Sequence, residues 1–499
     1  MLFRYVVSGF SGIGANLIVF SFVVGDTKLS LLSASVFGFI AAYIVTFLMH
    51  KYWTFKNLSR ELFYKQSVVY FFSAIITLLI NTSILYFLVT FFSLQPIFAQ
   101  FVSLLFAAVL SLFFTTLVTF NTNASRIEGI TSFFSFGLYA FLEQQKKWIL
   151  ALLFIMCLCA ATRLLFLPLT FTTDSESYVA TAQLLEGDTN AVIYGERILK
   201  PLAPAVMVAI STVGVSLETA LLIQAIFFYF VLGMMVFWFG YEFFSKSGHA
   251  FLLSLIVVTS YPIVRYGVNY YTETGIWAIY FALLAAIMRW VRKPSFVMLV
   301  FISMLLLAGL LWKEYAVLPG LMFGIAILFH TKLSWTEKIC ALLQTAFLVL
   351  IPWGLWQYSV YMHYDYSYLN WFAIGAAPGA YTSEYSLFNI SKTFAALLLC
   401  VWPLVFVGLY RFQTLTRESK KMLAIMLLPS FGFLLWGFVS SRLFFSLVPL
   451  IAPFVVLGFM ALPTARIKIV VILLVVVVNS ILTTLLFDPA IRLLLNSYS

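Results

Sequence analysis

The sequence predicts an all-α polytopic membrane protein with about 15 transmembrane helices. Hydrophobic residues make up 63% of the 499 residues and charged residues only 9%. The mean hydropathy is +1.05, which excludes a soluble domain. The apolar runs are continuous and roughly 17–25 residues long, enough for a helix to cross a hydrocarbon core of about 30 Å.

The basic residues indicate the topology of these spans. The net charge is +11, but Lys and Arg are spread over short loops, so we expect no nucleic-acid partner. Loops rich in basic residues alternate with poorer ones, which fits a cytoplasmic N-terminus. We expect the chain in the plasma (inner) membrane. The opposite, extracytoplasmic loops carry the unusual charged residues: Asp174, Glu176, Arg197, Lys200, Arg265, Glu273, Lys313, Glu314 and Arg442.

The first predicted domain, residues 1–120, contains four spans and an internal repeat. At one constant offset, Tyr5 recurs as Tyr70 and Asn16 as Asn81, without gaps. We interpret this as two helical hairpins in tandem, a parallel duplication of the kind found in transporters. Chance similarity between apolar sequences is the alternative.

Residues 121–147 form a predicted linker between two domains. Their apolar run at 130–141 is too short to span, so we expect an interfacial helix that packs the domains together, with a simple tether as the alternative. Residues 148–499 form the second domain, with about 11 spans. Within it, residues 198–214 follow Arg197 and Lys200 among prolines, which favours a surface or re-entrant helix over a span.

Cationic and amide side chains in the first domain are candidate lipid-binding groups. Cations at the cytoplasmic interface could bind the phosphate of a lipid carrier, and ordinary snorkelling or topology signalling is the alternative. The membrane-embedded amides could bind a head group or hydrogen-bond to neighbouring helices. Trp53 is either part of this site or an interfacial anchor. The candidates are Arg4, Asn16, His50, Lys51, Trp53 and Asn81.

Residues 1 to about 122 resemble the GtrA family of small four-helix membrane proteins. The resemblance rests on RYVVSG at residues 4–9, Asn16, and HKYWTF at residues 50–55. The fourth predicted span ends in Thr119 and Phe120 without the preceding basic residue and Trp, a departure from the motif. The resemblance implies movement of polyprenyl-phosphate-linked sugars across the membrane.

Asp174 and Glu176 are the candidate catalytic residues of the second domain. Burying a carboxylate in hydrocarbon is costly, so acids at a membrane surface mark a loop that meets polar substrate or water. Asp174 is a candidate general base or acceptor-orienting group, and a helix N-cap is the alternative. Glu176 could orient the acceptor or join Asp174 in a divalent-cation site, with simple solvation as the alternative. No other cofactor is indicated.

Cations at extracytoplasmic span ends are candidates for binding a donor phosphate. Arg265, Lys313 and Arg442 could neutralise a phosphate leaving group. An interfacial anchor is the alternative role for Arg442, and a solvated span end is the alternative for Lys313 and Glu314. Glu273 and Glu314 could bind sugar or acceptor hydroxyls, or pair with these cations.

Residues 148 to about 488 resemble the GT-C glycosyltransferases, particularly those related to the aminoarabinose and protein mannosyl transferases. The resemblance rests on DSESY at residues 174–178, YYTET at 270–274, WKE at 312–314 and SRLFF at 441–445. It implies that Tyr178 contacts sugar or acceptor. It also implies transfer from a polyprenyl-phosphate donor to an extracytoplasmic glycan, lipid or protein, with inversion at the anomeric carbon.

Together the two domains predict a membrane glycosyltransferase fused to a domain that flips or supplies its lipid-linked sugar. Fusion would raise the local concentration of donor. One alternative is a transporter of polyprenyl-linked sugars without catalysis. Another is a transferase whose N-terminal domain is a scaffold that recruits a donor-synthesising glycosyltransferase.

Overall fold

The computed structural model describes residues 2–26, 31–49, 138–166, 169–188, 190–375, 387–398, 401–435, 441–464, 466–468 and 470–471, together with residues 81, 82, 85, 89, 100 and 103. The regular secondary structure of these residues is helical throughout. The chain divides into two compact units, Met1–Lys146 and Lys147–Ser499.

Four helices of the described residues are long and apolar enough to cross a membrane: Gln144–Leu165, Leu217–Phe244, Glu273–Arg292 and Trp335–Tyr364. Shorter apolar helices of 10–17 residues accompany them. The helix α6 (Leu138–Phe166) runs without a break through residue 147, so the boundary expected there falls inside a helix. Most of the expected interfacial helix at 130–141 lies outside the described residues, as does most of the last predicted span.

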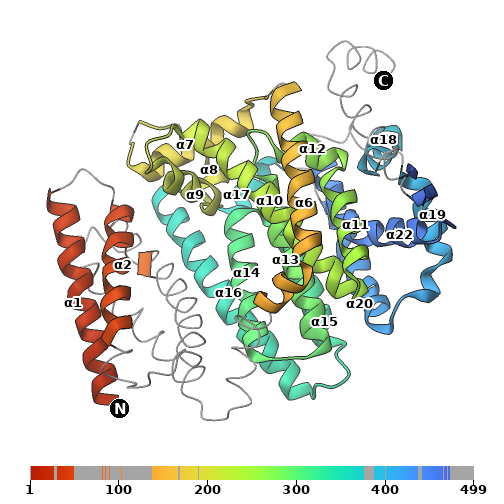
Figure 1. Ribbon diagram of the computed structural model, residues 1–499. Coiled ribbons are helices and arrows are strands. Elements are labelled where there is room, and N and C mark those ends of the chain that lie inside the picture. Colours follow the sequence, from red (N-terminus) through yellow and green to blue (C-terminus); the bar gives the residue numbers. More distant parts are fainter. Residues whose placement is uncertain are drawn as a thin grey trace. The chain divides into compact units, whose positions relative to one another are not determined.

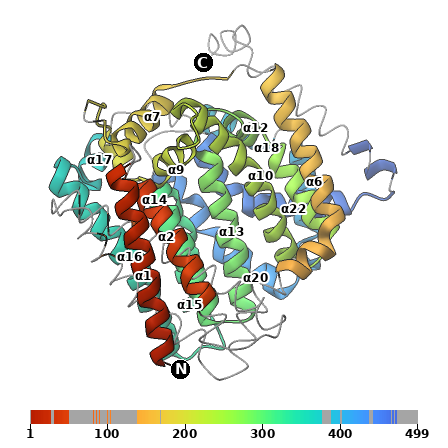
Figure 2. The ribbon, with the colours of Figure 1, turned by 60° about the vertical axis from the view of Figure 1, so that its left-hand side comes forward.

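The first unit contains α1 (Leu2–Asp26) and α2 (Leu31–Met49), which lie side by side (Figures 1 and 2). Small residues allow their close approach, because a Cβ at Gly38 would lie 2.9 Å from the Asn16 carbonyl oxygen. Phe20, Ala34 and Leu85 share one buried apolar cluster. Leu85 is the residue that the sequence repeat pairs with Phe20, so corresponding positions of the two halves meet in one core.

The second unit is built around α13 (Glu273–Arg292), whose apolar window is 89% buried. The helices α10 (Leu217–Phe244) and α14 (Phe296–Trp312) pack against it, and α16 (Trp335–Tyr364) packs against α14. Short helices α7 (Thr173–Glu186), α8 (Gly195–Ile198) and α9 (Leu202–Ser211) lie together at one end of this bundle (Figure 1). At about 1.5 Å per residue, α9 is too short to span a membrane.

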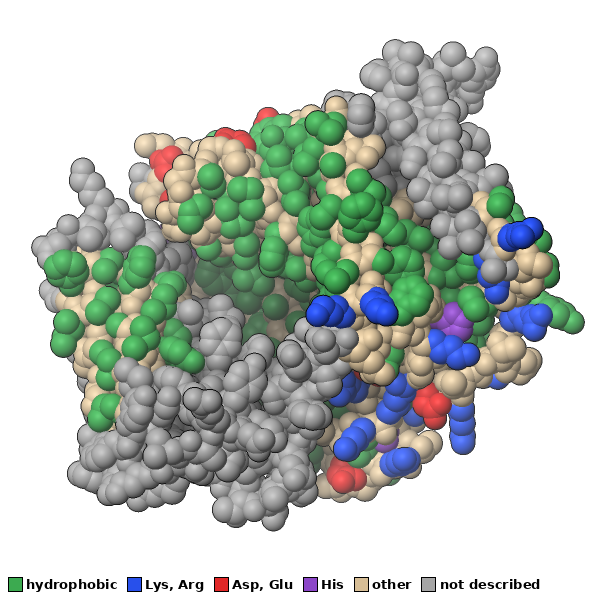
Figure 3. Space-filling model, viewed as in Figure 1, with side chains coloured by type: hydrophobic (Ala, Val, Ile, Leu, Met, Phe, Trp, Pro, Cys, Tyr) green, Lys and Arg blue, Asp and Glu red, His purple; other side chains and the backbone are tan. Residues whose placement is uncertain are grey.

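The remaining elements complete the second unit in chain order. They are α11 (Ser247–Val258), α12 (Tyr261–Gly267), η4 (Glu314–Ala316), α15 (Val317–Leu328), α17 (Tyr368–Gly375), α18 (Leu387–Leu398), α19 (Trp402–Tyr410), η7 (Phe412–Thr414), α20 (Arg417–Leu427), η8 (Pro429–Leu435), α21 (Ser441–Phe444), η9 (Phe445–Leu447) and α22 (Val448–Met460). On the face shown in Figure 3, the Lys and Arg side chains gather away from α7 and α8. The positive-inside rule gives this distribution when α7 and α8 lie outside the cytoplasm.

Reciprocal glycine contacts bring α19 and α22 together. A Cβ at Gly408 would overlap the Phe454 carbonyl oxygen, and a Cβ at Gly458 would overlap the Leu404 carbonyl oxygen. Small residues allow this backbone approach in membrane helix pairs. Because only η9 separates α22 from α21, which carries Arg442, this crossing also anchors α21.

Gly408→Ala and Gly458→Ala should each destabilise the protein, because the added methyl group meets backbone and forces the helices apart. Overpacking of this kind costs about 1–3 kcal/mol. Gly354→Ala is the matched control, since a Cβ there would meet no neighbouring element among the described residues within 4 Å. Thermal unfolding in detergent should begin several degrees lower for the two variants than for the control. Equal unfolding of all three would show that the crossing tolerates separation.

Candidate functional site

The acidic stretch of the sequence forms the first turn of α7. Thr172 is the N-cap, and its side chain makes a capping box with Ser175, while the Ser175 hydroxyl donates to the Tyr270 carbonyl oxygen at 2.8 Å. A capping box satisfies amide groups at the helix start that have no partner within the helix. The N-cap role considered for Asp174 is therefore wrong, and its carboxylate is available for other contacts.

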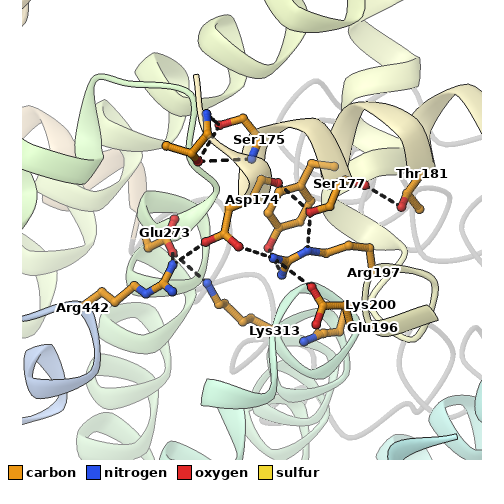
Figure 4. Close-up of polar contacts among 12 residues, drawn as sticks. Asp174, Ser175, Ser177, Thr181, Glu196, Arg197, Lys200, Glu273, Lys313 and Arg442 are labelled. Carbon is orange, nitrogen blue, oxygen red and sulfur yellow. Dashed lines mark hydrogen bonds and ion pairs between the residues drawn. The ribbon is translucent and has the colours of Figure 1, made fainter. Parts of the chain in front are cut away.

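Asp174 joins two arginines that come from distant parts of the chain. Its Oδ1 lies 2.7 Å from Arg197 Nη2 of α8, and its Oδ2 lies 2.6 Å from Arg442 Nη1 of α21 (Figure 4). Arg197 is held from its other side, because its Nε donates to Ser177 Oγ at 2.8 Å and its Nη1 to the Tyr178 hydroxyl at 3.2 Å. Asp174 keeps 32% of its side chain exposed, so a substrate can reach it.

A second row of ion pairs continues from Arg442. Glu273, the first residue of α13, accepts from Lys313 Nζ at 2.8 Å and lies 3.4 Å from Arg442 Nη1. Beside this row, Lys200 Nζ lies 2.8 Å from Glu314 Oε2. Arg197 also lies 3.3 Å from Glu196. The cations are Arg197, Lys200, Lys313 and Arg442, and the carboxylates are Asp174, Glu196, Glu273 and Glu314. The cluster is therefore balanced in charge, with each cation already facing a carboxylate.

This arrangement fixes the charge of Asp174. Burial alone would raise the pKa of its carboxyl, but the positive charges of Arg197, Arg442 and Lys313 outweigh burial and lower the pKa to about 2. Burial would likewise lower the pKa of Arg442, but Glu273 and Asp174 raise it above its usual value. Opposite charges at such distances favour both charged forms. Asp174 is consequently anionic at neutral pH.

The end of α16 positions α8 and the residues after it. Trp356 Nε1 donates to the Ile198 carbonyl oxygen at 2.9 Å, and Gln357 Nε2 donates to the Leu199 carbonyl oxygen at 3.0 Å. These carbonyl groups end a short helix and need partners from outside it. The ring of Trp371 lies 5.2 Å from Lys200 Nζ, within the range of a cation–π contact. Residues far along the chain thus hold Arg197 and Lys200 in place.

The structure brings together Asp174, Glu273, Lys313 and Arg442 of the predicted site, and it places Glu314 with Lys200. Glu176 is exposed and, two residues on, lies roughly 200° around the helix from Asp174. Among the described residues no group of three His, Cys, Asp or Glu side chains is placed to hold a metal ion. Tyr178 is buried beneath the Arg197 guanidinium, 4.4 Å from it.

Some predicted residues fall outside what the structure describes. Arg265 is part of α12 and Arg4 is part of α1, but their side chains are not described, and His50, Lys51 and Trp53 are not described at all. Conversely, the prediction did not assign Arg197 and Lys200 to the site. Their spacing of three residues within a proline-flanked loop was the available signal, since it places both on one side of a helical turn.

The amides predicted in the first unit are buried and bonded between helices. Asn16 Oδ1 accepts from Gln100 Nε2 at 2.7 Å. Asn81 Nδ2 donates to Ser35 Oγ at 3.3 Å, and Asn81 Oδ1 accepts from the Ser103 hydroxyl at 2.8 Å. Contacts between neighbouring helices were one of the two roles considered for these amides.

Comparison with known proteins identifies the first unit by sequence. Residues 4–120 match the family described as GtrA/DPMS, transmembrane domain, so this part of the chain contains a GtrA/DPMS transmembrane domain. The match confirms the resemblance based on the motifs at residues 4–9 and 50–55. No match is found among curated proteins.

The second similarity is to solved structures of ArnT from Cupriavidus metallidurans. The structure bound to undecaprenyl phosphate has 13% sequence identity and a TM-score of 0.50, covering 66% of this chain and 63% of that one. The apo structure has 13% identity and a TM-score of 0.47, covering 64% of this chain and 60% of that one. The similarity to the structure bound to undecaprenyl phosphate confirms, at the level of the fold, the resemblance that the sequence predicted for the second unit. The chain spans less than two thirds of the length of ArnT.

Proposed function

We propose that the second unit is a glycosyltransferase that takes a monosaccharide from a polyprenyl-phosphate donor and gives it to an extracytoplasmic glycan, lipid or protein. The observation that carries this proposal is the cluster of cations and carboxylates assembled from α7, α8, α13, α21 and the α14–η4 junction. The fold of the second unit is similar to that of ArnT, which has been solved with bound undecaprenyl phosphate.

The chemistry follows from the residue types. Breaking the bond between the sugar and the phosphate leaves negative charge on the departing phosphate, which fixed cations stabilise. Arg442 and Lys313 are suited to this role, because both lie beside the partly exposed Asp174. A guanidinium can bind two phosphate oxygens at once. Direct attack by an acceptor hydroxyl would invert the anomeric carbon.

Asp174 is the group that acts on the acceptor. While both arginines face it, its low pKa makes it a poor proton acceptor. A donor phosphate would compete with Asp174 for Arg442, and removal of a neighbouring positive charge raises the pKa of a carboxyl. Donor binding would therefore free the carboxylate both to orient the acceptor hydroxyl and to accept its proton.

The first unit, on this proposal, supplies the donor. The match to the GtrA/DPMS transmembrane domain supports a role with lipid-linked sugars, and fusion to the transferase keeps the supply close to the site of use. The donor is already activated, so transfer needs no nucleotide. The lipid carrier reaches both units through the bilayer.

Deletion of residues 1–122 tests the role of the first unit. In proteoliposomes given donor only in the leaflet opposite the transferase site, the truncated protein should transfer at least tenfold less sugar than the full chain. Donor supplied to both leaflets should restore transfer if the first unit flips donor. A loss that persists with donor in both leaflets would contradict a supply role. Full transfer from the opposite leaflet without residues 1–122 would favour a scaffold for a donor synthase.

A further inference from the structure

Polar contacts in the first unit occur in pairs that are equivalent under the sequence repeat. The repeat that pairs Asn16 with Asn81 also pairs Ser35 with Gln100. In the structure Asn16 bonds to Gln100, and Asn81 bonds to Ser35. Exchanging the halves therefore turns one contact into the other, as expected for two similar halves related by a two-fold axis.

A second pair of contacts is also equivalent under the repeat, but only one of the two is a hydrogen bond. Ser103 donates to Asn81 Oδ1, and the residue that the repeat pairs with Ser103 is Gly38. Gly38 lies against Asn16 in the corresponding place, because a Cβ there would be 3.0 Å from Asn16 Oδ1. Glycine has no hydroxyl, so Asn16 receives no such hydrogen bond from α2.

This difference leaves one half of the cluster incompletely bonded. Asn81 uses both ends of its amide. Among the residues that the structure describes, Asn16 Nδ2 and Gln100 Oε1 have no hydrogen-bond partner, although both side chains are 0% exposed. Turning both amides over exchanges the atoms but still leaves one donor and one acceptor open.

An open donor and an open acceptor in this position need a specific kind of partner. Asn16 is about 21 Å along α1 from its start, near the middle of a 25-residue helix in the part that matches a transmembrane domain. Hydrocarbon offers no hydrogen bonds at that depth. A hydroxyl group both donates and accepts, so a single hydroxyl can satisfy both atoms. The phosphodiester of a lipid-linked sugar carries no proton to donate at neutral pH and can satisfy only one of them.

We infer that Asn16 and Gln100 form a binding site for a sugar hydroxyl of the lipid-linked donor within the membrane, while Asn81, Ser35 and Ser103 hold the bundle together. The inference rests on the proposed supply function of the first unit. It assigns different roles to two asparagines that the repeat makes equivalent. The site binds the sugar and not the phosphate.

Photo-crosslinking of the full chain in proteoliposomes tests this site. The probes are undecaprenyl-phosphate-linked glucose, galactose, mannose and aminoarabinose, each with a diazirine on the sugar, and labelled peptides are identified by mass spectrometry. The variant Asn16→Leu/Gln100→Met removes both polar partners together, which leaves no orphan amide and so protects folding. Thr82→Val is the matched control, because Thr82 bonds to Ser35 in the fully bonded half.

A probe that labels the loop around Asp174 should also label peptides containing Asn16 or Gln100. Labelling at these peptides should fall at least tenfold in the double variant and stay unchanged in Thr82→Val, and excess undecaprenyl phosphate without sugar should not compete there. Labelling near Asp174 but not near Asn16, or equal labelling of the double variant, would overturn the inference and leave the transferase proposal standing. A water molecule would then satisfy the amides. Failure to label either unit would overturn the proposed donor as well.

Discussion

Replacing Asp174 by asparagine should lower sugar transfer by about 10²–10⁴-fold, the usual contribution of a positioned acid or base. Asparagine keeps the shape of the side chain but can neither accept the acceptor's proton nor face Arg197 and Arg442 as an anion. Donor binding should persist, because those arginines remain and lose a competing carboxylate. The measurement is transfer by purified protein from a panel of synthetic polyprenyl-phosphate sugars, together with donor binding by the same samples.

Asp188→Asn is the matched control for this experiment. Asp188 is exposed beyond the other end of α7, where it accepts a hydrogen bond from the Asn190 backbone at 2.9 Å, and its replacement should leave transfer unchanged. Donor that stays intact with every acceptor, in the wild-type protein as well, would contradict the transferase proposal. Sugar-lipid flux without turnover would instead support a transporter without catalysis.

The Asp174 carboxylate makes the stability of the folded protein depend on pH. Its folded-state pKa of about 2 lies below the ordinary value of 3.8, so its ion pairs stabilise the folded protein above about pH 4 and lose this effect as the pH falls toward 2. The difference in thermal stability between wild type and Asp174→Asn should therefore be constant from pH 7 to about pH 5 and smaller at pH 3. A constant difference down to pH 3 would show that the ion pairs do not set it.

Much of the site was predictable because membrane chemistry makes charge rare. In a chain with 9% charged residues, each carboxylate or cation at a predicted span end needs a polar partner. This reasoning selected Asp174, Glu273, Lys313, Glu314 and Arg442, which the structure places in paired contacts. The membrane class and the identity of the first unit followed from hydropathy and from short motifs at residues 4–9 and 50–55.

The pairing itself could not be predicted. Asp174 and Arg442 are 268 residues apart, and no local pattern in either segment specifies the other. Arg197 was not assigned to the site, because its role depends on the contacts of its guanidinium with Ser177 and Tyr178. Glu176 resembles Asp174 in sequence, but helical geometry turns it to the exposed side.

The helix count shows a different limit of sequence reasoning. Hydropathy locates apolar segments, but a helix such as α11 is apolar and, with 12 residues, is too short to cross. The structure shows further apolar helices of 10–17 residues among the described residues. Packing against neighbouring helices, not hydropathy alone, decides how such segments lie.

Replacing Arg442 by lysine should weaken donor phosphate binding by roughly 10–150-fold, because lysine keeps the charge but loses the planar fork that binds two oxygens. A hydrogen bond to a charged group contributes about 1.5–3 kcal/mol, which corresponds to this range. The measurement is the affinity for undecaprenyl phosphate and the KM for the sugar-bearing donor. Arg411→Lys is the control, since Arg411 is exposed at the end of α19.

The double variant Asp174→Asn/Arg442→Lys separates two roles of Arg442. If Arg442 only positions Asp174, its replacement should have no further effect once Asp174 is asparagine, because the interaction it served is already lost. If Arg442 binds the donor phosphate, undecaprenyl phosphate affinity should fall by a similar factor in both backgrounds. Since Arg442 contacts both Asp174 and Glu273 and a phosphate would compete with these carboxylates, we expect the second result. Unchanged affinity in the Asp174→Asn background would assign Arg442 to positioning alone.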